Sequence, residues 1–144
     1  MTAIFSKKCE LALQAVLFLS AQEPSKRFNA QEIADHLTVP KEFLSKILQS
    51  LTSEGIIGSK KGKFGGFYLA KPASEIRLID IVMIIDGLEM FHKCVLGFRG
   101  CSVEEPCPVH GKWGKLRDET YRMLSEETLE DLRDQTMHKI NTLK

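Results

Sequence analysis

Three cysteines and a histidine lie close together in the second half of the chain, and these are the side chains best suited to chemistry. Cys94, Cys101, Cys107 and His110 follow one another with the spacing C-x6-C-x5-C-x2-H. Thiolates are the ligands that soft metal ions and iron–sulfur clusters prefer. Because structural zinc sites usually begin with two cysteines only about two to four residues apart, the wider gaps here favour a loop around a larger, iron–sulfur centre.

Three thiolates leave one iron atom without a fourth protein ligand, and three side chains are candidates for it. His110 and His92 lie on the same loop, whereas Glu10 lies in the expected first helix, from which it could reach the centre of a partner subunit. Two other interpretations of the cysteines stay open: inert buried thiols, and a redox-active thiol loop without metal. The fourth cysteine, Cys9, is predicted to be a packing residue.

The first half of the chain predicts helices that would position a DNA-reading surface. Asn29 and Glu32 have the spacing of a capping box, and the break Thr38-Val39-Pro40 separates two helices, which together predict a helix-turn-helix. Apolar residues recur at helical spacing in three segments: residues 6–22, 29–37 and 40–54.

A basic β-hairpin is predicted directly after the third helix. Strands at residues 56–60 and 67–70 flank a glycine-rich turn at residues 61–66. The order helix, break, helix, hairpin is that of a winged helix, whose third helix enters the major groove of DNA. Taken singly, each polar residue of the third helix and the hairpin could instead be an ordinary solvated surface residue that does not contact DNA. Seven side chains are expected to contact DNA bases and phosphates: Lys41, Ser45, Lys46, Gln49, Lys60, Lys61 and Lys63.

Further helices are predicted around the cysteine loop. A nearly apolar helix at residues 75–87 is expected to lie between other elements. Residues 90–111 are expected to form a loop, followed by a helix at residues 113–124 and a last helix from about Ser125 or Thr128. The helix at residues 113–124 has an apolar face that could be a dimer face or an internal core face. This face consists of Trp113, Leu116, Tyr121 and Leu124.

The predicted fold class is mainly α with a small β-hairpin. We expect a winged helix-turn-helix DNA-binding domain at residues 1–75. Residues 76–144 are expected to form the cysteine-loop region, which holds the metal cluster, together with C-terminal dimerisation helices. With 144 residues, the chain has the length of one domain or of one small domain with an appendage.

Charge is divided unevenly along the chain. Residues 1–71 carry ten Lys and Arg against six Asp and Glu, whereas residues 72–144 carry ten against thirteen, which suits a basic nucleic-acid surface in the first half. No apolar run approaches the roughly 20 residues of a membrane span, and Glu10 and Gln14 interrupt the run that a signal peptide would need. We therefore expect a cytoplasmic protein without a membrane partner. An enzyme is not predicted, because no nucleophile–base pair, phosphate loop or cofactor fingerprint occurs at a meaningful spacing.

The sequence resembles the IscR/NsrR-like family of winged-helix regulators, the Rrf2 family, in three segments. These are Glu10-Leu11-Ala12-Leu13; the wing from Gly62 to Leu69 with the following Ala73-Ser74-Glu75-Ile76; and the cysteine trio with His110 and Trp113. The resemblance implies a homodimer in which each subunit holds a 2Fe–2S or 4Fe–4S iron–sulfur cluster near the partner's first helix. It also implies that the state of the cluster sets affinity for a palindromic operator in double-stranded DNA. Family members sense nitric oxide, iron supply, redox state or cluster-assembly demand, and some lack a cluster.

Two features of the resemblance favour different branches of the family. His110 resembles the histidine ligand of the cluster-biogenesis branch, whereas Glu10 matches the acidic first-helix ligand of the nitric-oxide and redox-sensing branches. The first cysteine gap, with six intervening residues, departs from the more common five. The predicted function is thus a transcription regulator, a repressor, under iron–sulfur control. The alternative is a metal-free or zinc-stabilised winged-helix regulator or interaction module.

Overall fold

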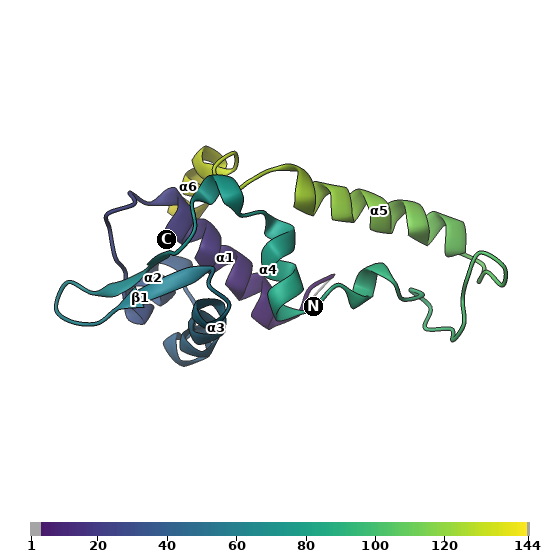
Figure 1. Ribbon diagram of the computed structural model, residues 1–144, viewed down its shortest axis with the longest axis horizontal. Coiled ribbons are helices and arrows are strands. Elements are labelled where there is room, and N and C mark those ends of the chain that lie inside the picture. The colour runs from purple at the N-terminus through teal and green to yellow at the C-terminus, as the bar shows by residue number, and fades with distance from the viewer. Residues whose placement is uncertain (1–3, 144) are drawn as a thin grey trace.

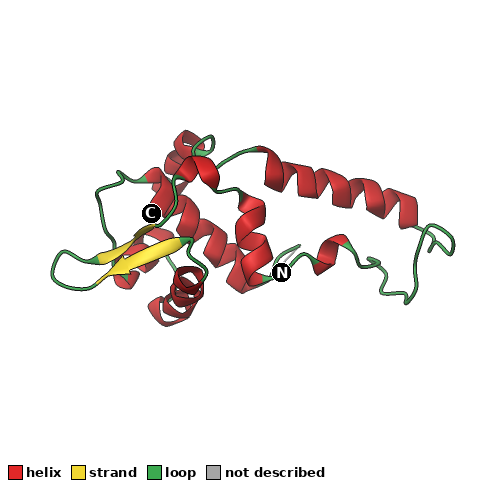
Figure 2. Cartoon of the chain, viewed as in Figure 1, coloured by secondary structure: helices red, strands yellow, loops and turns green. Residues whose placement is uncertain are grey.

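The computed structural model describes residues 4–143, which form an elongated molecule of helices with one β-hairpin (Figures 1 and 2). The hairpin projects from one end of the long axis, and the cysteine loop lies at the other end, beyond the start of α5 (Figure 1). The six α-helices are α1 (Lys7–Ala21), α2 (Ala30–Leu37), α3 (Lys41–Ser53), α4 (Leu78–Ile85), α5 (His110–Glu126) and α6 (Arg133–Asn141). The strands are β1 (Ile57–Lys60) and β2 (Gly66–Leu69), and the 3-10 helices are η1 (Ala73–Glu75) and η2 (Glu89–Phe91).

The helix-turn-helix forms as its sequence signals predict. The Asn29 side chain accepts a hydrogen bond from the Glu32 amide at 2.8 Å, and the Glu32 carboxylate accepts one from the Asn29 amide at 3.0 Å. This capping box satisfies two amides that the first turn of a helix leaves free. Thr38 ends α2 with a left-handed φ of 60°, and α3 follows after Pro40. Four residues at helical spacing then anchor α3 in the core: Leu44, Ile47, Leu48 and Leu51.

The hairpin is fastened to the helical body through β2. β1 and β2 pair antiparallel, with Ile57 opposite Leu69 and Lys60 opposite Gly66. Phe28, in the segment before α2, exchanges two backbone hydrogen bonds with Phe67 of β2, at 2.7 and 3.2 Å. These bonds extend the hairpin by one short bridge and fix its direction relative to α2 and α3. The mainly α winged helix that the sequence predicts is therefore confirmed.

The second half differs from the sequence prediction at the helix starts. α4 begins at Leu78, not at residue 75, because η1 precedes it and the Asp80 carboxylate accepts a hydrogen bond from the Arg77 amide. α5 begins at His110, three residues earlier than expected. The expected start of the last helix at Ser125 or Thr128 is wrong. Thr128 instead forms a β-bridge with Arg77, and α6 starts only at residue 133.

One apolar core joins the two halves of the chain. Ile76, Ile81, Leu129 and Ile140 belong to the same buried cluster as the apolar residues of α1, α2 and α3. Because this core crosses residue 75, the boundary there does not separate two independent cores. It stays a proposal that assigns DNA binding to residues 1–75 and the metal centre and dimer contact to residues 76–144. Ile84 and Ile85, expected to be buried, are half-buried.

A second, smaller cluster attaches α5 to the body. It combines Cys9 of α1 with Ile79 and Val82 of α4, Phe91 of η2 and Leu124 of α5. Leu124 is the one fully buried residue of α5, so the rest of this helix extends outward with the cysteine loop at its start (Figure 1). No helix within residues 4–143 combines the length and the apolar character needed to cross a bilayer.

Candidate metal centre and DNA-binding surface

The cysteine loop brings its three thiols together. The sulfur atoms of Cys94, Cys101 and Cys107 all lie within 4.8 Å of one another, and the Cys94 and Cys107 sulfurs are 3.5 Å apart. All three side chains are half-buried and belong to neither apolar cluster, so the interpretation as inert core thiols is wrong. Three soft ligands this close can share one inorganic centre, and the donor set therefore fits a metal ion or an iron–sulfur cluster.

The first turns of α5 hold the loop at two points. The His110 Nδ1 atom lies 3.2 Å from the Cys101 sulfur. One turn further along, the Trp113 indole donates a hydrogen bond to the Lys93 carbonyl at 2.9 Å, directly before Cys94. The Cys107 amide also donates to the Cys101 sulfur at 3.4 Å. Local sequence patterns do not predict this role of Trp113, because the contact joins residues 20 apart in the chain.

The three thiols are not equivalent electrostatically. Desolvation acts to raise the pKa of Cys94, but hydrogen bonds overcome it and lower this pKa to about 7. The bonds come from the backbone at Phe98 and Leu96 and from the thiols of Cys107 and Cys101. Desolvation and the two neighbouring thiols raise the pKa of Cys107, against a backbone hydrogen bond at Val109. Cys94 therefore becomes a thiolate, the form that binds metal, more readily than Cys107 does.

A small cavity of about 20 Å³ adjoins the thiols. Besides the three cysteines, its lining includes His92, Lys93, His110, Trp113 and Arg117. The cationic side chain of Arg117 suits a centre whose thiolate ligands carry negative charge, whereas the Lys93 ammonium pairs with the Glu89 carboxylate at 2.9 Å. His92 and His110 both reach this lining, and His110 is the one that contacts a cysteine sulfur.

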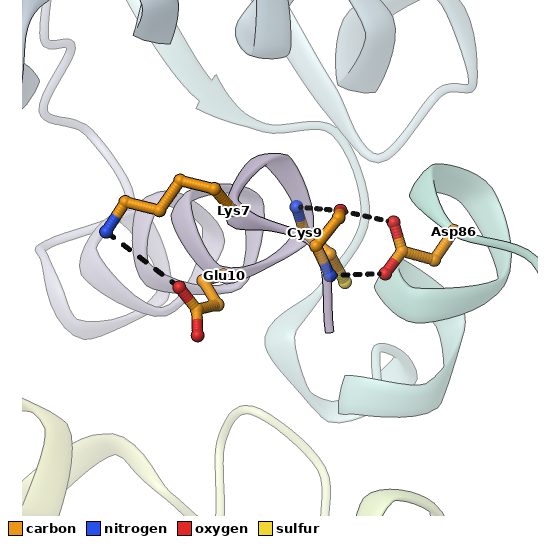
Figure 3. Close-up of polar contacts among 5 residues, drawn as sticks. Lys7, Cys9, Glu10 and Asp86 are labelled. Atoms are coloured by element: carbon orange, nitrogen blue, oxygen red, sulfur yellow. Dashed lines mark hydrogen bonds and ion pairs between the residues drawn. The ribbon is translucent and has the colours of Figure 1, made fainter. Parts of the chain in front are cut away.

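Glu10, the third candidate ligand, lies elsewhere in its own subunit. It sits in the first turns of α1, where its carboxylate pairs with the Lys7 ammonium at 3.8 Å. Glu10 and Lys7 lie to one side of α1, away from the contacts of Ser6, Cys9 and Asp86 (Figure 3). Its role as a ligand therefore requires the partner subunit and stays a prediction.

Cys9 is a core residue, as its position in an amphipathic helix predicts. Its side chain is fully buried. Burial, followed by the charge and hydrogen bond of Asp86 and the charge of Glu10, raises the pKa of the Cys9 thiol to about 12. Asp86 also accepts a hydrogen bond from the Ser6 amide at 2.9 Å, and the Ser6 hydroxyl accepts one from the Cys9 amide at 3.1 Å. This group joins the start of α1 to the end of α4 (Figure 3).

The residues expected to contact DNA lie on α3 and the hairpin. Lys41, Lys46 and Gln49 of α3 are exposed, and Ser45 is half-buried. The ion pairs found among residues 4–143 involve Lys7, Lys93 and Arg122 as the cations. The five lysines expected to meet DNA (Lys41, Lys46, Lys60, Lys61 and Lys63) therefore remain available to phosphates.

Two exposed aromatic residues beside these lysines were not singled out from the sequence. Phe43 of α3, which fits the apolar spacing of its helix, is 40% exposed, and Phe64 at the hairpin turn is 85% exposed. A phenylalanine between lysine and glycine in a turn is the signal that could have marked Phe64, because nothing in a two-stranded hairpin can cover it.

A helix-turn-helix followed by a basic hairpin defines the class of winged-helix DNA-binding proteins. The Rrf2 family, described as iron-dependent transcriptional regulators, matches residues 5–135, and the chain belongs to this family. It is therefore a helix-turn-helix transcriptional regulator, not an enzyme.

Relatives of nearly equal length support this assignment. An HTH-type transcriptional regulator of Aquifex aeolicus is 32% identical over 131 residues, covering 90% of each chain. The regulator NsrR of Oceanobacillus iheyensis is 30% identical over 130 residues, or 88% of this chain and 86% of that one. CymR, the global cysteine regulator of B. subtilis, superposes with a TM-score of 0.75 over 93% of this chain and 98% of its own. At 23% identity that likeness shows the shared fold alone.

The contrast between Cys9 and the loop thiols predicts selective alkylation. In the metal-free protein at mildly alkaline pH, iodoacetamide should modify Cys94, Cys101 and Cys107 quickly, because they are accessible. Cys9 should react only after unfolding in guanidinium, because it is buried and stays protonated below a pKa of about 12. Peptide mass spectrometry measures both rates, and a Cys9→Ala variant should give the same loop labelling. Equal rates at Cys9 and the loop would contradict this assignment.

Proposed function

We propose that this protein represses transcription as a homodimer whose affinity for a palindromic operator is controlled by an iron–sulfur cluster on the cysteine loop. The observation that supports the cluster is the convergence of three accessible sulfur atoms within 4.8 Å. The family's description as iron-dependent regulators agrees with it. When bound, a cluster supplies a centre that oxidants, nitric oxide or iron shortage can alter. Because the proposed partner is DNA, the proposal assigns the protein to the cytoplasm.

In this proposal α3 lies in the major groove and the hairpin beside it. Lys41, Ser45, Lys46 and Gln49 face bases and phosphates from α3, and the hairpin lysines Lys60, Lys61 and Lys63 bind the phosphate backbone. Residues 1–75 thus bind DNA, whereas residues 76–144 hold the metal centre and the dimer contact. One recognition helix grips little DNA alone, so two half-sites about one helical turn apart require two subunits.

The exposed face of α5 supports a second copy of the chain as the partner. Leu116 and Met123, two turns apart, are 58% and 59% exposed, with Thr120 between them. Tyr121 and Leu124, predicted to share their face, lie differently: Tyr121, 44% exposed, packs edge-on against the Phe91 ring, and Leu124 is buried. α5 also carries basic and acidic residues. A two-fold symmetric interface needs both kinds, because the same surface must be complementary to itself in charge.

The distance between the two functional ends explains why control acts through the dimer. Within one chain, the cysteine loop and the hairpin lie at opposite ends of the molecule (Figure 1). Cys94, Cys101 and Cys107 would hold the centre, which would keep the loop against the partner's α1 and so set the spacing of the two α3 helices. Without it, the loop would keep its own contacts, among them those of Trp113, His110 and the Cys107 amide, and the spacing would relax.

A zinc-stabilised regulator is the second candidate. The contact between the His110 Nδ1 atom and the Cys101 sulfur at 3.2 Å favours it, because three cysteines and one histidine form a common structural zinc set. Zinc would give a colourless protein, so metal analysis separates the two candidates.

Removal of the centre should change DNA affinity. Protein purified without oxygen should contain iron and sulfide and show thiolate-to-iron absorption, and stripping it by chelation should change affinity about 5–150-fold. The probe is a duplex selected from a randomised library by the untreated protein. A variant with Cys94, Cys101 and Cys107 all changed to Ala should be colourless and should keep the affinity of the stripped protein. Equal affinity before and after stripping, or one zinc per chain, would contradict iron–sulfur control.

The local contact of His110 predicts that it is the fourth ligand. His110→Ala should shift the absorption spectrum and speed loss of iron, because it removes the one candidate that touches a cysteine sulfur in its own subunit. His92→Ala is the matched control on the same loop and should leave the spectrum unchanged. If Glu10→Ala shifts the spectrum and His110→Ala does not, the ligand instead comes from the partner's first helix.

A charge on the exposed face of α5 should break the dimer. Met123→Glu should shift sedimentation from dimer to monomer, because a carboxylate would lose its hydration inside an apolar contact. Lys115→Glu, on another face of the same helix, is the control and should remain dimeric. A Met123→Glu variant that sediments as a dimer would rule out this face.

A further inference from the structure

The side chain of Phe64 is unusually exposed for an aromatic residue on a folded hairpin. It is 85% exposed, and the Lys63 ammonium lies 5.7 Å from the centre of its ring. Phe64 occupies the third position of a turn that the Gly65 amide closes by donating to the Gly62 carbonyl at 3.0 Å. The turn that carries Phe64 is the outer end of the hairpin, which projects from the helical body (Figure 1).

The turn that carries Phe64 has little freedom to fold away. Gly62 and Gly66 have φ of 109° and 140°, which side-chain-bearing residues rarely adopt. A Cβ atom at Gly65 would lie 1.9 Å from the Lys60 carbonyl oxygen, so the two hairpin arms meet there without room for a side chain. Since the Phe28 backbone also anchors β2, Phe64 is presented on a fixed support.

The charges around Phe64 indicate what covers it. Lys60, Lys61 and Lys63 precede it, Lys71 follows the hairpin, and residues 55–71 contain no aspartate or glutamate. An apolar ring whose charged neighbours are all cations is complementary to a binding partner with anionic edges and an apolar interior. Double-stranded DNA has this character, with phosphates along the groove walls and stacked bases within. α3, which has exposed lysines of its own, directly precedes the hairpin in the chain.

We infer that Phe64 is a wedge that enters the minor groove next to the α3 site and partly unstacks one base step in each half-site. The flanking lysines hold the two phosphate strands while the ring presses between bases, which bends the duplex towards the major groove. Pyrimidine–purine steps such as TA unstack most readily. Phe64 is thus a specificity-determining residue that reads the deformability of DNA and makes no hydrogen bond to a base. The inference rests on the proposed DNA binding and is independent of the metal.

The test compares wild type, Phe64→Ala and Phe64→Leu as full-length dimers on duplexes selected by the wild-type protein from a randomised library. In these duplexes, each base-pair step next to the α3 site is changed in turn to TA or made part of a stiff A-tract. Affinity is measured at several salt concentrations, and the bend by energy transfer between dyes at the duplex ends. Wild type should prefer TA at one step of each half-site by about tenfold and bend that duplex.

The two substitutions should separate the wedge from the phosphate contacts. Phe64→Ala should lose the step preference and the bend while its salt dependence stays unchanged, and Phe64→Leu should keep most of both. Lys63→Ala is the control: it should weaken all duplexes equally and lower the slope of log affinity against log salt by about one. Because Phe64 is exposed, thermal unfolding of its variants should match wild type.

Retention of step preference and bend by Phe64→Ala would overturn the wedge while leaving DNA binding intact. A wild-type protein that binds no duplex would overturn both.

Discussion

The burial of α1 is the constraint on which the rest of the structure depends. This helix lies at the centre of the molecule, with nine of its fifteen residues buried, and it contacts α2, α3, β2, α4 and α6. Because it packs on several sides, any shift of α1 must move the DNA-reading helices with it. The Ser6–Asp86 contact fixes the start of α1 to the end of α4, and Glu10 lies in the same first turn of α1. The part of the chain closest in space to a partner's cluster, in our proposal, is therefore also the part most rigidly joined to α3.

The elongated shape separates the cysteine loop from the DNA-binding surface (Figure 1). The cysteine loop depends on α5, which the small cluster around Leu124 attaches to the body at its far end only. This gives the loop few apolar contacts of its own, so in our proposal a bound metal centre would contribute much of its order. A region with little buried surface changes conformation at low free-energy cost, whereas the winged helix, with its dense core, keeps its shape. In our proposal, this division lets a local change in ligation alter the spacing of the two DNA-binding units of the dimer.

Local signals predicted the elements of the winged helix well and those of the second half less well. The capping box at Asn29 and the apolar spacing of α3 concern residues within a few positions of one another, so the sequence contains them. The late start of α6 has a long-range cause. Leu129 donates its amide to the Ile76 carbonyl at 2.8 Å, which holds the segment in a bridge where local propensity allows a helix. The apolar face of α5 divides in the same way, since whether Leu124 or Leu116 is buried depends on where α4 and η2 lie.

The sequence by itself determined the kind of chemistry, because residue types and spacing are written in it: three soft ligands on one loop, lysines on one hairpin and glycines where the turn needs them. Only the tertiary structure decided how these residues meet. It brought the Cys94 and Cys107 sulfurs to 3.5 Å, closed the Trp113 contact on Lys93, buried Cys9 away from the other thiols and left Phe64 uncovered. Each of these outcomes depends on packing between segments far apart in the chain, whose relative placement no local pattern contains.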